Sequence, residues 1–236
     1  MPFTRLVIAI LCGAASATFH IRSTASAAEP HTRSALVERF LAHEDPIPLT
    51  GYRATRRMHA ANVRFKKQAR VEARTSFDPI AGFKYEVVTQ EGSSLVRDRA
   101  LLPILEAEAR VWADGTAHRS ALTESNYEFG EGGEPGWLRI RPRRDDRLLV
   151  DGAILVEPVS GDLLRIEGRL AKNPSFWTRR VDVVREYQRI QGVRVPTRVV
   201  SRASLRLFGV SEFEMTYEYE EINGEPVAGA ASAARP

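Results

Sequence analysis

The chain has 236 residues, 43% of them hydrophobic and 27% charged, and its 34 Lys and Arg residues against 30 Asp and Glu residues give a net charge of +4. This length predicts one domain or two small ones, and this composition argues against wholesale disorder. So small a net charge does not by itself indicate a nucleic-acid binder. A single cysteine excludes a disulfide scaffold and any multi-cysteine zinc or iron–sulfur site.

The N-terminus has the three parts of a secretory signal peptide. A basic residue precedes an apolar run over residues 6–12, and two Ala-x-Ala cleavage sites follow at residues 15–17 and 25–27. The run is far shorter than the ~20 apolar residues of a membrane-spanning helix; the alternative is a buried N-terminal helix. We expect residues 1–27 to be removed on export to the periplasm, which leaves a cysteine-free, soluble or surface-associated chain.

Two segments have apolar side chains at helical spacing. Residues 34–43 predict a short amphipathic helix, which two prolines end and a turn-rich connection over residues 44–52 follows. Residues 94–112 also fit a helix, but Pro103 lies within them and lacks the N–H that a helix interior needs. This segment therefore predicts two short helices or one kinked helix, packed across the face of a sheet.

Most of the remaining chain alternates apolar and polar side chains with period two, which predicts strands. Residues 63–77 give the clearest alternation, and residues 83–87 open a second strand that completes a hairpin. Further strands are expected near residues 125–130, 136–142, 147–157, 162–171, 179–190, 193–207 and 211–222. Because short turns join them, they predict an antiparallel meander, and residues 225–236 predict a disordered tail.

The last two predicted strands also fix their own register. One face of the final strand is apolar or aromatic, whereas its other face carries Glu212, Glu214, Glu218 and Glu220. Arg198, Arg202 and Arg206 share one face of the strand before it. Matching these arginines with the glutamates requires an odd number of loop residues, so we expect a three-residue loop with Gly209 in the left-handed conformation.

The motifs of common enzyme classes are not found, and the histidines are scattered. The pairs Glu212/Glu214 and Glu218/Glu220 lie about 7 Å apart at strand spacing, within the range of an inverting glycosidase. Because they share the polar face, we interpret them as solvated partners of arginines. We therefore expect no catalytic residue, no metal site and no cofactor.

Two surface features are open to more than one interpretation. A basic cluster near Trp137 is a solvated strand edge or a contact for anionic lipid headgroups, and export argues against nucleic acid. Phe176 and Trp177 lie at an expected hairpin tip, where they fold back over the core or touch a membrane or partner. The basic cluster comprises Arg139, Arg141, Arg143, Arg144 and Arg147.

The predicted fold is mainly β, a curved antiparallel meander that forms an open, unclosed barrel. The N-terminal helix and the helical insert cover the opening, in a single domain over residues 28–224. A transmembrane barrel is the rival. The 63–77 strand is longer than the usual 9–11 spanning residues, and a small barrel has little room for helices, so we favour the soluble form.

This arrangement resembles the LolA/LolB-like superfamily of periplasmic lipoprotein carriers over about residues 36–222. The resembling features are the signal peptide, the N-terminal helix, the long alternating strands, the helical insert and the meander. Within the meander, residues 151–158, 161–168 and 192–196 follow the pattern of that group. The resemblance implies a carrier that binds a lipid or lipoprotein acyl chain, and no functional residue is carried over from it.

Burial of each methylene of an acyl chain is worth about 0.8 kcal/mol, so a carrier needs an apolar surface to enclose it, with the helices as a lid. The side chains expected to line that surface are Phe65, Val71, Phe77, Phe83, Tyr85, Val87, Ile166, Val183, Tyr187, Phe213, Met215 and Tyr217. There are two alternatives. In the first, the same side chains fill a core, and the protein is a periplasmic sensor or interaction module that binds an envelope protein. In the second, it is an enzyme acting on envelope polymers, which would need two acids facing a cleft.

Overall fold

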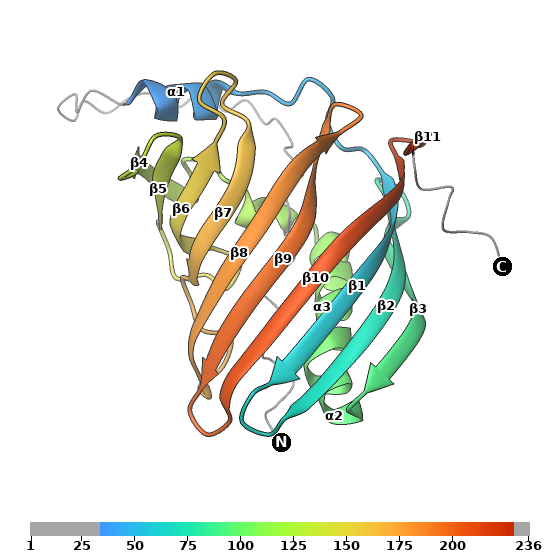
Figure 1. Cartoon of the computed structure of the whole chain (residues 1–236). Helices are drawn as coiled ribbons and strands as arrows, with labels where there is room; N and C mark the ends of the chain where they lie inside the picture. The colour runs from blue at the N-terminus through green and yellow to red at the C-terminus, as the bar shows by residue number, and fades with distance from the viewer. Residues whose placement is uncertain (1–33, 229–236) are drawn as a thin grey trace.

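The computed structural model describes residues 34–228, so the expected signal peptide lies outside the described residues. These residues form one curved antiparallel sheet with the strand order β3-β2-β1-β10-β9-β8-β7-β6-β5-β4, and β11 pairs with β10 (Figure 1). The end strands β3 and β4 do not pair, so the barrel is open as predicted. The strands are β1 (Tyr52–Asn62), β2 (Lys67–Asp78), β3 (Gly82–Gly92), β4 (Tyr127–Glu131), β5 (Trp137–Pro142), β6 (Val150–Val156), β7 (Leu163–Leu170), β8 (Thr178–Ile190), β9 (Val193–Leu205), β10 (Gly209–Ile222) and β11 (Glu225–Pro226).

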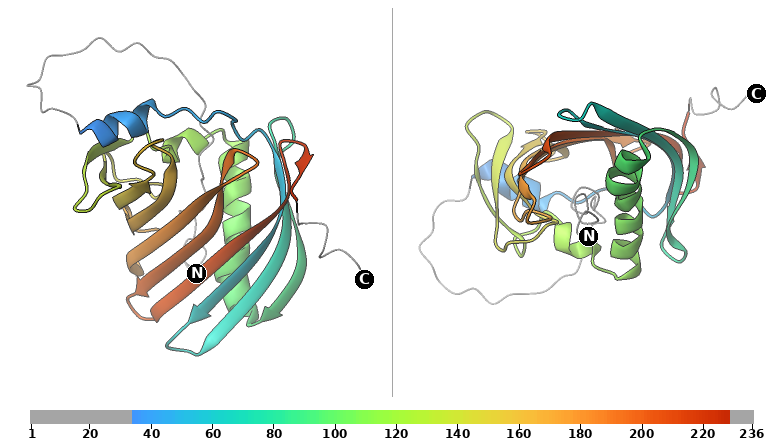
Figure 2. Two further views of the ribbon diagram at one scale, coloured as in Figure 1. Left: turned by 45° about the horizontal axis from the view of Figure 1, so that its top comes forward. Right: turned by 90° about the horizontal axis from the view of Figure 1, so that it is seen from below.

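The helices lie at one end and on one side of the sheet (Figures 1 and 2). Helix α1 (Ala35–Ala42) crosses the end near β4, as the sequence predicts. The insert is one helical run formed by α2 (Ser94–Val96), the π-helical turn η1 (Arg97–Leu101) and α3 (Leu102–Ala113), and a 3-10 turn, η2 (Ala117–Ser120), follows. The insert is thus one run and not two separate helices, and its π-helical turn ends two residues before Pro103. No described helix combines the length and apolarity required to span a bilayer.

The prediction of one strand over residues 63–77 is wrong at its beginning. Residues 63–66 form the turn of a hairpin, and β1, which the sequence reading missed, precedes it. The inward side chains of β1 include the small residues Ala54 and Ala60 and the cation Arg56. The sequence of β1 therefore shows no clear apolar alternation, although this strand lies between β2 and β10 in the sheet.

The meander from β4 to β10 lies close to its predicted ranges, and the register of its last hairpin is confirmed. Leu205 pairs with Gly209 across a three-residue loop, and Gly209 is left-handed, with φ +70°. Arg198 Nε donates to Glu214 at 2.8 Å. Glu225–Pro226, which the sequence places in the tail, instead pairs with β10, and the tail from residue 229 lies outside the described residues.

The sheet bends where two glycines face each other. Gly152 of β6 pairs with Gly168 of β7, and Gly168 has φ +154°. A Cβ on Gly152 would lie 2.1 Å from the Glu167 carbonyl oxygen, and one on Gly168 would lie 2.4 Å from that of Asp151. The backbones approach too closely here for any other residue, so this pair lets the meander curl toward β4.

Candidate functional site

The concave face of the sheet carries the apolar side chains. Arg56 of β1 reaches Glu108 of α3, so side chains of its parity face the helix side. The register extends this parity across the sheet, because directly paired residues share a face. One transverse row runs through Val71, Met58, Met215, Val199, Arg185, Ile166, Ile154 and Leu138. Every member is buried, and Arg185 is its one charged residue.

A buried ion pair ties α3 to this concave face. Arg56, only 1% exposed, donates to both carboxylate oxygens of Glu108, at 2.5 and 3.0 Å, and also to the Tyr52 hydroxyl at 2.6 Å. Its guanidinium lies 4.9 Å from the ring centre of Phe83 and 4.7 Å from that of Tyr217. Sequence reasoning missed both charges, which lie 52 residues apart.

Burial controls the ionisation of the groups around that pair. It raises the pKa of the Tyr52 and Tyr217 hydroxyls, against the opposing charge of Arg56, so both stay neutral at physiological pH. The pKa of Arg56 is raised as well: burial opposes its charge, but the Glu108 carboxylate together with Tyr52 and Tyr217 more than compensates. The pair is thus a fixed pair of charges in an aromatic, apolar surrounding.

Most of the residues predicted to line the site share this face. Val71, Phe83, Ile166, Val183, Tyr187, Phe213 and Met215 are buried, and Phe77, Val87 and Tyr217 are half-buried. One placement is corrected: Phe65 lies in the β1–β2 turn and is half exposed, because the strand begins only at Lys67. Tyr85, on the edge strand β3, shares the face of Phe83 and is exposed.

The convex face carries the predicted glutamates, three of them in ion pairs, and Glu220 accepts a hydrogen bond from the Thr55 hydroxyl. Glu218 accepts from Arg57 at 2.6 Å, Glu214 from Arg198 at 2.8 Å, and Glu212 lies 3.9 Å from Arg202. None of these carboxylates shares the concave face, so the spacing expected of a glycosidase pair occurs away from the apolar surface.

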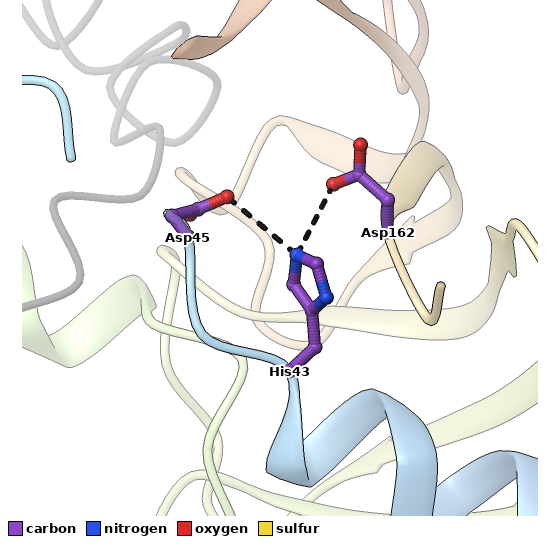
Figure 3. Close-up of side chains that lie close together, drawn as sticks. All are labelled: His43, Asp45 and Asp162. Atoms are coloured by element: carbon purple, nitrogen blue, oxygen red, sulfur yellow. Dashed lines mark ion pairs between the residues drawn. The ribbon is translucent and has the colours of Figure 1, made fainter. Parts of the chain in front are cut away.

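A second charged cluster joins α1 to the far end of the sheet. His43, Asp45 and Asp162 point toward one another from the end of α1, the connection after it and the start of β7 (Figure 3). His43 Nε2 lies 3.7 Å from Asp45 Oδ1 and 3.6 Å from Asp162 Oδ1. Sequence reasoning, which found the histidines scattered, missed this cluster because Asp162 lies more than 100 residues from His43 and Asp45.

Arginines occupy the centre of this cluster. Arg189 Nη2 lies 3.1 Å from His43 Nε2, 2.8 Å from Asp45 Oδ1 and 2.9 Å from Asp162 Oδ1. Arg194 Nη2 donates to Asp45 Oδ2 at 2.6 Å. A guanidinium nitrogen thus sits where a cation bound by the three residues would lie. We call this arrangement the arginine clamp, and it fixes α1 to the β8–β9 hairpin.

The structure separates the two predicted surface features. Phe176 is 72% exposed and Trp177 is half-buried, so the pair does not fold back as a unit. In the basic cluster, Arg143 pairs with Glu128 and Arg144 with Asp146, whereas Arg141 forms no ion pair within residues 34–228. This cluster is partly a set of structural ties and partly a free basic surface.

Comparisons with known proteins give likeness of shape only. No family model matches the chain, and no curated protein does. Two solved structures are similar. One is a domain named for outer membrane lipoprotein sorting from Vibrio parahaemolyticus, with a TM-score of 0.37 and 10% identity, covering 78% of this chain and 91% of that one. The other is a LolA superfamily protein from Nitrosomonas europaea, with a TM-score of 0.35 and 12% identity, covering 78% and 90%. Both of these structures are named for the group that the sequence resembles.

Proposed function

We propose that this is an exported periplasmic protein that binds a lipid or lipoprotein acyl chain non-covalently on its concave face, as a carrier or chaperone. The observation that carries the proposal is the transverse apolar row, which continues across eight strands of an unclosed sheet. An open sheet can admit a chain between strands and helices without breaking a strand ladder. Each methylene covered there contributes about 0.8 kcal/mol.

The charged groups of this face are engaged within the chain. Arg56 pairs with Glu108, and Arg185 Nη1 lies 3.4 Å from the Tyr187 hydroxyl. The face therefore offers a ligand mainly apolar contact, as an acyl chain requires. Helix α3, held by Arg56 and Glu108, serves as the lid of the site in this proposal.

The test is native mass spectrometry of the exported chain, purified without detergent, followed by solvent extraction of bound molecules. Val183→Trp fills the concave face, and the matched control Val184→Trp puts the same ring on the convex face of the same strand. We expect a co-purifying lipid mass in the unmodified chain and in Val184→Trp, and its loss in Val183→Trp. Near-ultraviolet circular dichroism checks that both variants fold.

A chain that stays free of ligand after incubation with envelope lipids would overturn the carrier proposal. The second candidate is then a sensor or interaction module that binds an envelope protein. The observation that favours it is the exposed ring of Phe176 at a hairpin tip.

A further inference from the structure

The end of the sheet opposite α1 presents three hairpin tips (Figure 1). They comprise residues 63–67 between β1 and β2, residues 172–180 from the β7–β8 loop into β8, and residues 206–208 between β9 and β10. We call these three segments the basic tips. They come from distant parts of the chain, and antiparallel pairing brings them to one edge.

Direct contacts make the basic tips one surface. The backbone N–H of Arg206 donates to the Trp177 carbonyl at 2.8 Å. Arg64 Nη1 donates to the Leu207 carbonyl at 2.9 Å. These bonds join the middle tip to each of its neighbours, so the edge is continuous and braced.

The basic tips hold seven cations and no acidic residue. Within the described part of the chain only one of them forms an ion pair, Arg180 with Asp182 at 2.6 Å. The others meet solvent, backbone carbonyls or ring faces. The seven are Arg64, Lys66, Lys67, Lys172, Arg179, Arg180 and Arg206. So many cations of one sign on one edge create a local positive potential.

Apolar side chains stand among these cations. Phe176 is 72% exposed, Leu207 57%, Val63 55% and Phe65 50%. The Arg206 guanidinium lies 4.7 Å from the ring centre of Phe176, which orders that ring without covering it. Exposed aromatic and aliphatic side chains surrounded by Lys and Arg are the pattern of a surface that lies on a membrane interface.

A cleft of about 460 Å³ adjoins the 172–180 tip. Four arginines line it, together with two acids and one amide: Arg141, Arg169, Arg179, Arg180, Asp145, Asp151 and Asn173. Asp151 holds Arg169 at 2.7 Å and Asp182 holds Arg180 at 2.6 Å, while Arg141 and Arg179 form no ion pair within the described chain. The arginines outnumber the acids in this lining, and guanidinium groups suit a phosphate, which they can bind with paired hydrogen bonds.

We propose that the basic tips dock the protein on a membrane surface rich in anionic phospholipids. The exposed apolar side chains enter the interface, the cations lie against the headgroups, and the arginine-lined cleft receives a lipid phosphate. This docking requires no ligand on the concave face, so it holds or fails independently of the proposed function.

The test is flotation with vesicles of phosphatidylglycerol and phosphatidylcholine in equal parts, against phosphatidylcholine alone. Removal of two tip cations in Lys66→Gln/Lys67→Gln should weaken binding about 25-fold, at about fivefold for each cation. Phe176→Ser should weaken it about tenfold, and Arg141→Gln should weaken it through the cleft. Raising the salt from about 0.1 M to about 1 M should release the protein, because the Debye length falls from about 10 Å to about 3 Å.

Matched controls remove the same groups elsewhere. Arg74→Gln/Lys84→Gln removes two exposed cations from β2 and β3, and Ile80→Ser removes an exposed apolar side chain from a turn at the opposite end. All variants have the same N-terminus, which mass spectrometry checks. Any contribution of the N-terminal apolar run to vesicle binding is therefore equal in all of them.

Three outcomes would overturn the proposal. They are equal binding to both kinds of vesicle, an equal loss in the control variants, and no binding to anionic vesicles at low salt. In the last case the basic tips would instead face an acidic protein surface.

Discussion

The two ends of the sheet use arginine differently. At the end beside α1, the arginine clamp sets Arg189 and Arg194 against Asp45 and Asp162, at 2.6–3.4 Å. At the other end, the basic tips hold seven cations with one ion pair among the described residues. Arginines with carboxylates at hand fasten segments of the chain to one another, whereas arginines without them attract an anion from outside. The pairing of the charge, and not its amount, separates a structural end from a binding end.

The largest effect should come from the most deeply buried of the paired charges. Glu108→Gln leaves Arg56 charged and buried, and breaking such a pair costs about 3–5 kcal/mol of the free energy of unfolding. Urea denaturation measures the loss. Glu106→Gln is the control, because Glu106 lies on the same helix in an exposed pair with Arg110 at 3.8 Å, which is worth at most about 1 kcal/mol. Equal losses in the two variants would contradict this interpretation.

The arginine clamp should rank next. Asp162 accepts from Arg189 Nε at 2.6 Å and lies 3.4 Å from Arg194, and its side chain is 11% exposed. Asp162→Asn removes the charge that both guanidinium groups share, at a cost of about 2–3 kcal/mol for charge-assisted hydrogen bonds. Asp182→Asn breaks the exposed pair with Arg180 and should cost under about 1 kcal/mol. If both substitutions cost the same in urea denaturation, the clamp is no more than a surface ion pair.

The buried tyrosines make the free energy of unfolding depend on pH. Burial raises the pKa of Tyr127 to about 12, from about 10 in an unfolded chain. Between these values the unfolded chain releases a proton that the folded chain keeps, so stability present in full below pH 10 falls as the pH rises. Tyr127→Phe should flatten that fall by about 1.4 kcal/mol per pH unit, in urea titrations at successive pH values. An equally steep fall in Tyr127→Phe would contradict this assignment.

The parts of the fold that sequence reasoning found are those with one mostly apolar face. Strands β8, β9 and β10 lie close to their predicted ranges, because most of their inward positions are apolar or aromatic, with Arg185 as the charged exception, and most of their outward positions are polar or charged. Strand β1 escaped because Arg56 and two alanines occupy inward positions, so its period-two signal is weak. Arg56, which weakens the apolar alternation of β1, is also the residue that binds α3 to the sheet.

The charged pairs of the site could not be predicted from the sequence, because their members are far apart in the chain. Arg56 meets Glu108 across 52 residues, and Arg194 meets Asp45 across 149. Each residue alone reads as ordinary surface charge, and only the pairing of strands distant in sequence brings the partners together. The apolar face of the sheet was predictable since it follows from local periodicity, and Phe65 was misplaced where a turn interrupted that periodicity.

The smallest expected effect on stability belongs to the basic tips, and it completes the contrast between the ends. Lys66→Gln/Lys67→Gln removes two exposed charges that form no ion pair in residues 34–228, so the free energy of unfolding should change by under about 0.5 kcal/mol. The same variant should lose most of its binding to anionic vesicles. Urea denaturation beside flotation tests both statements on one protein. A loss of stability as large as that of Asp162→Asn would show that these lysines fasten the fold and would erase the distinction between the two ends.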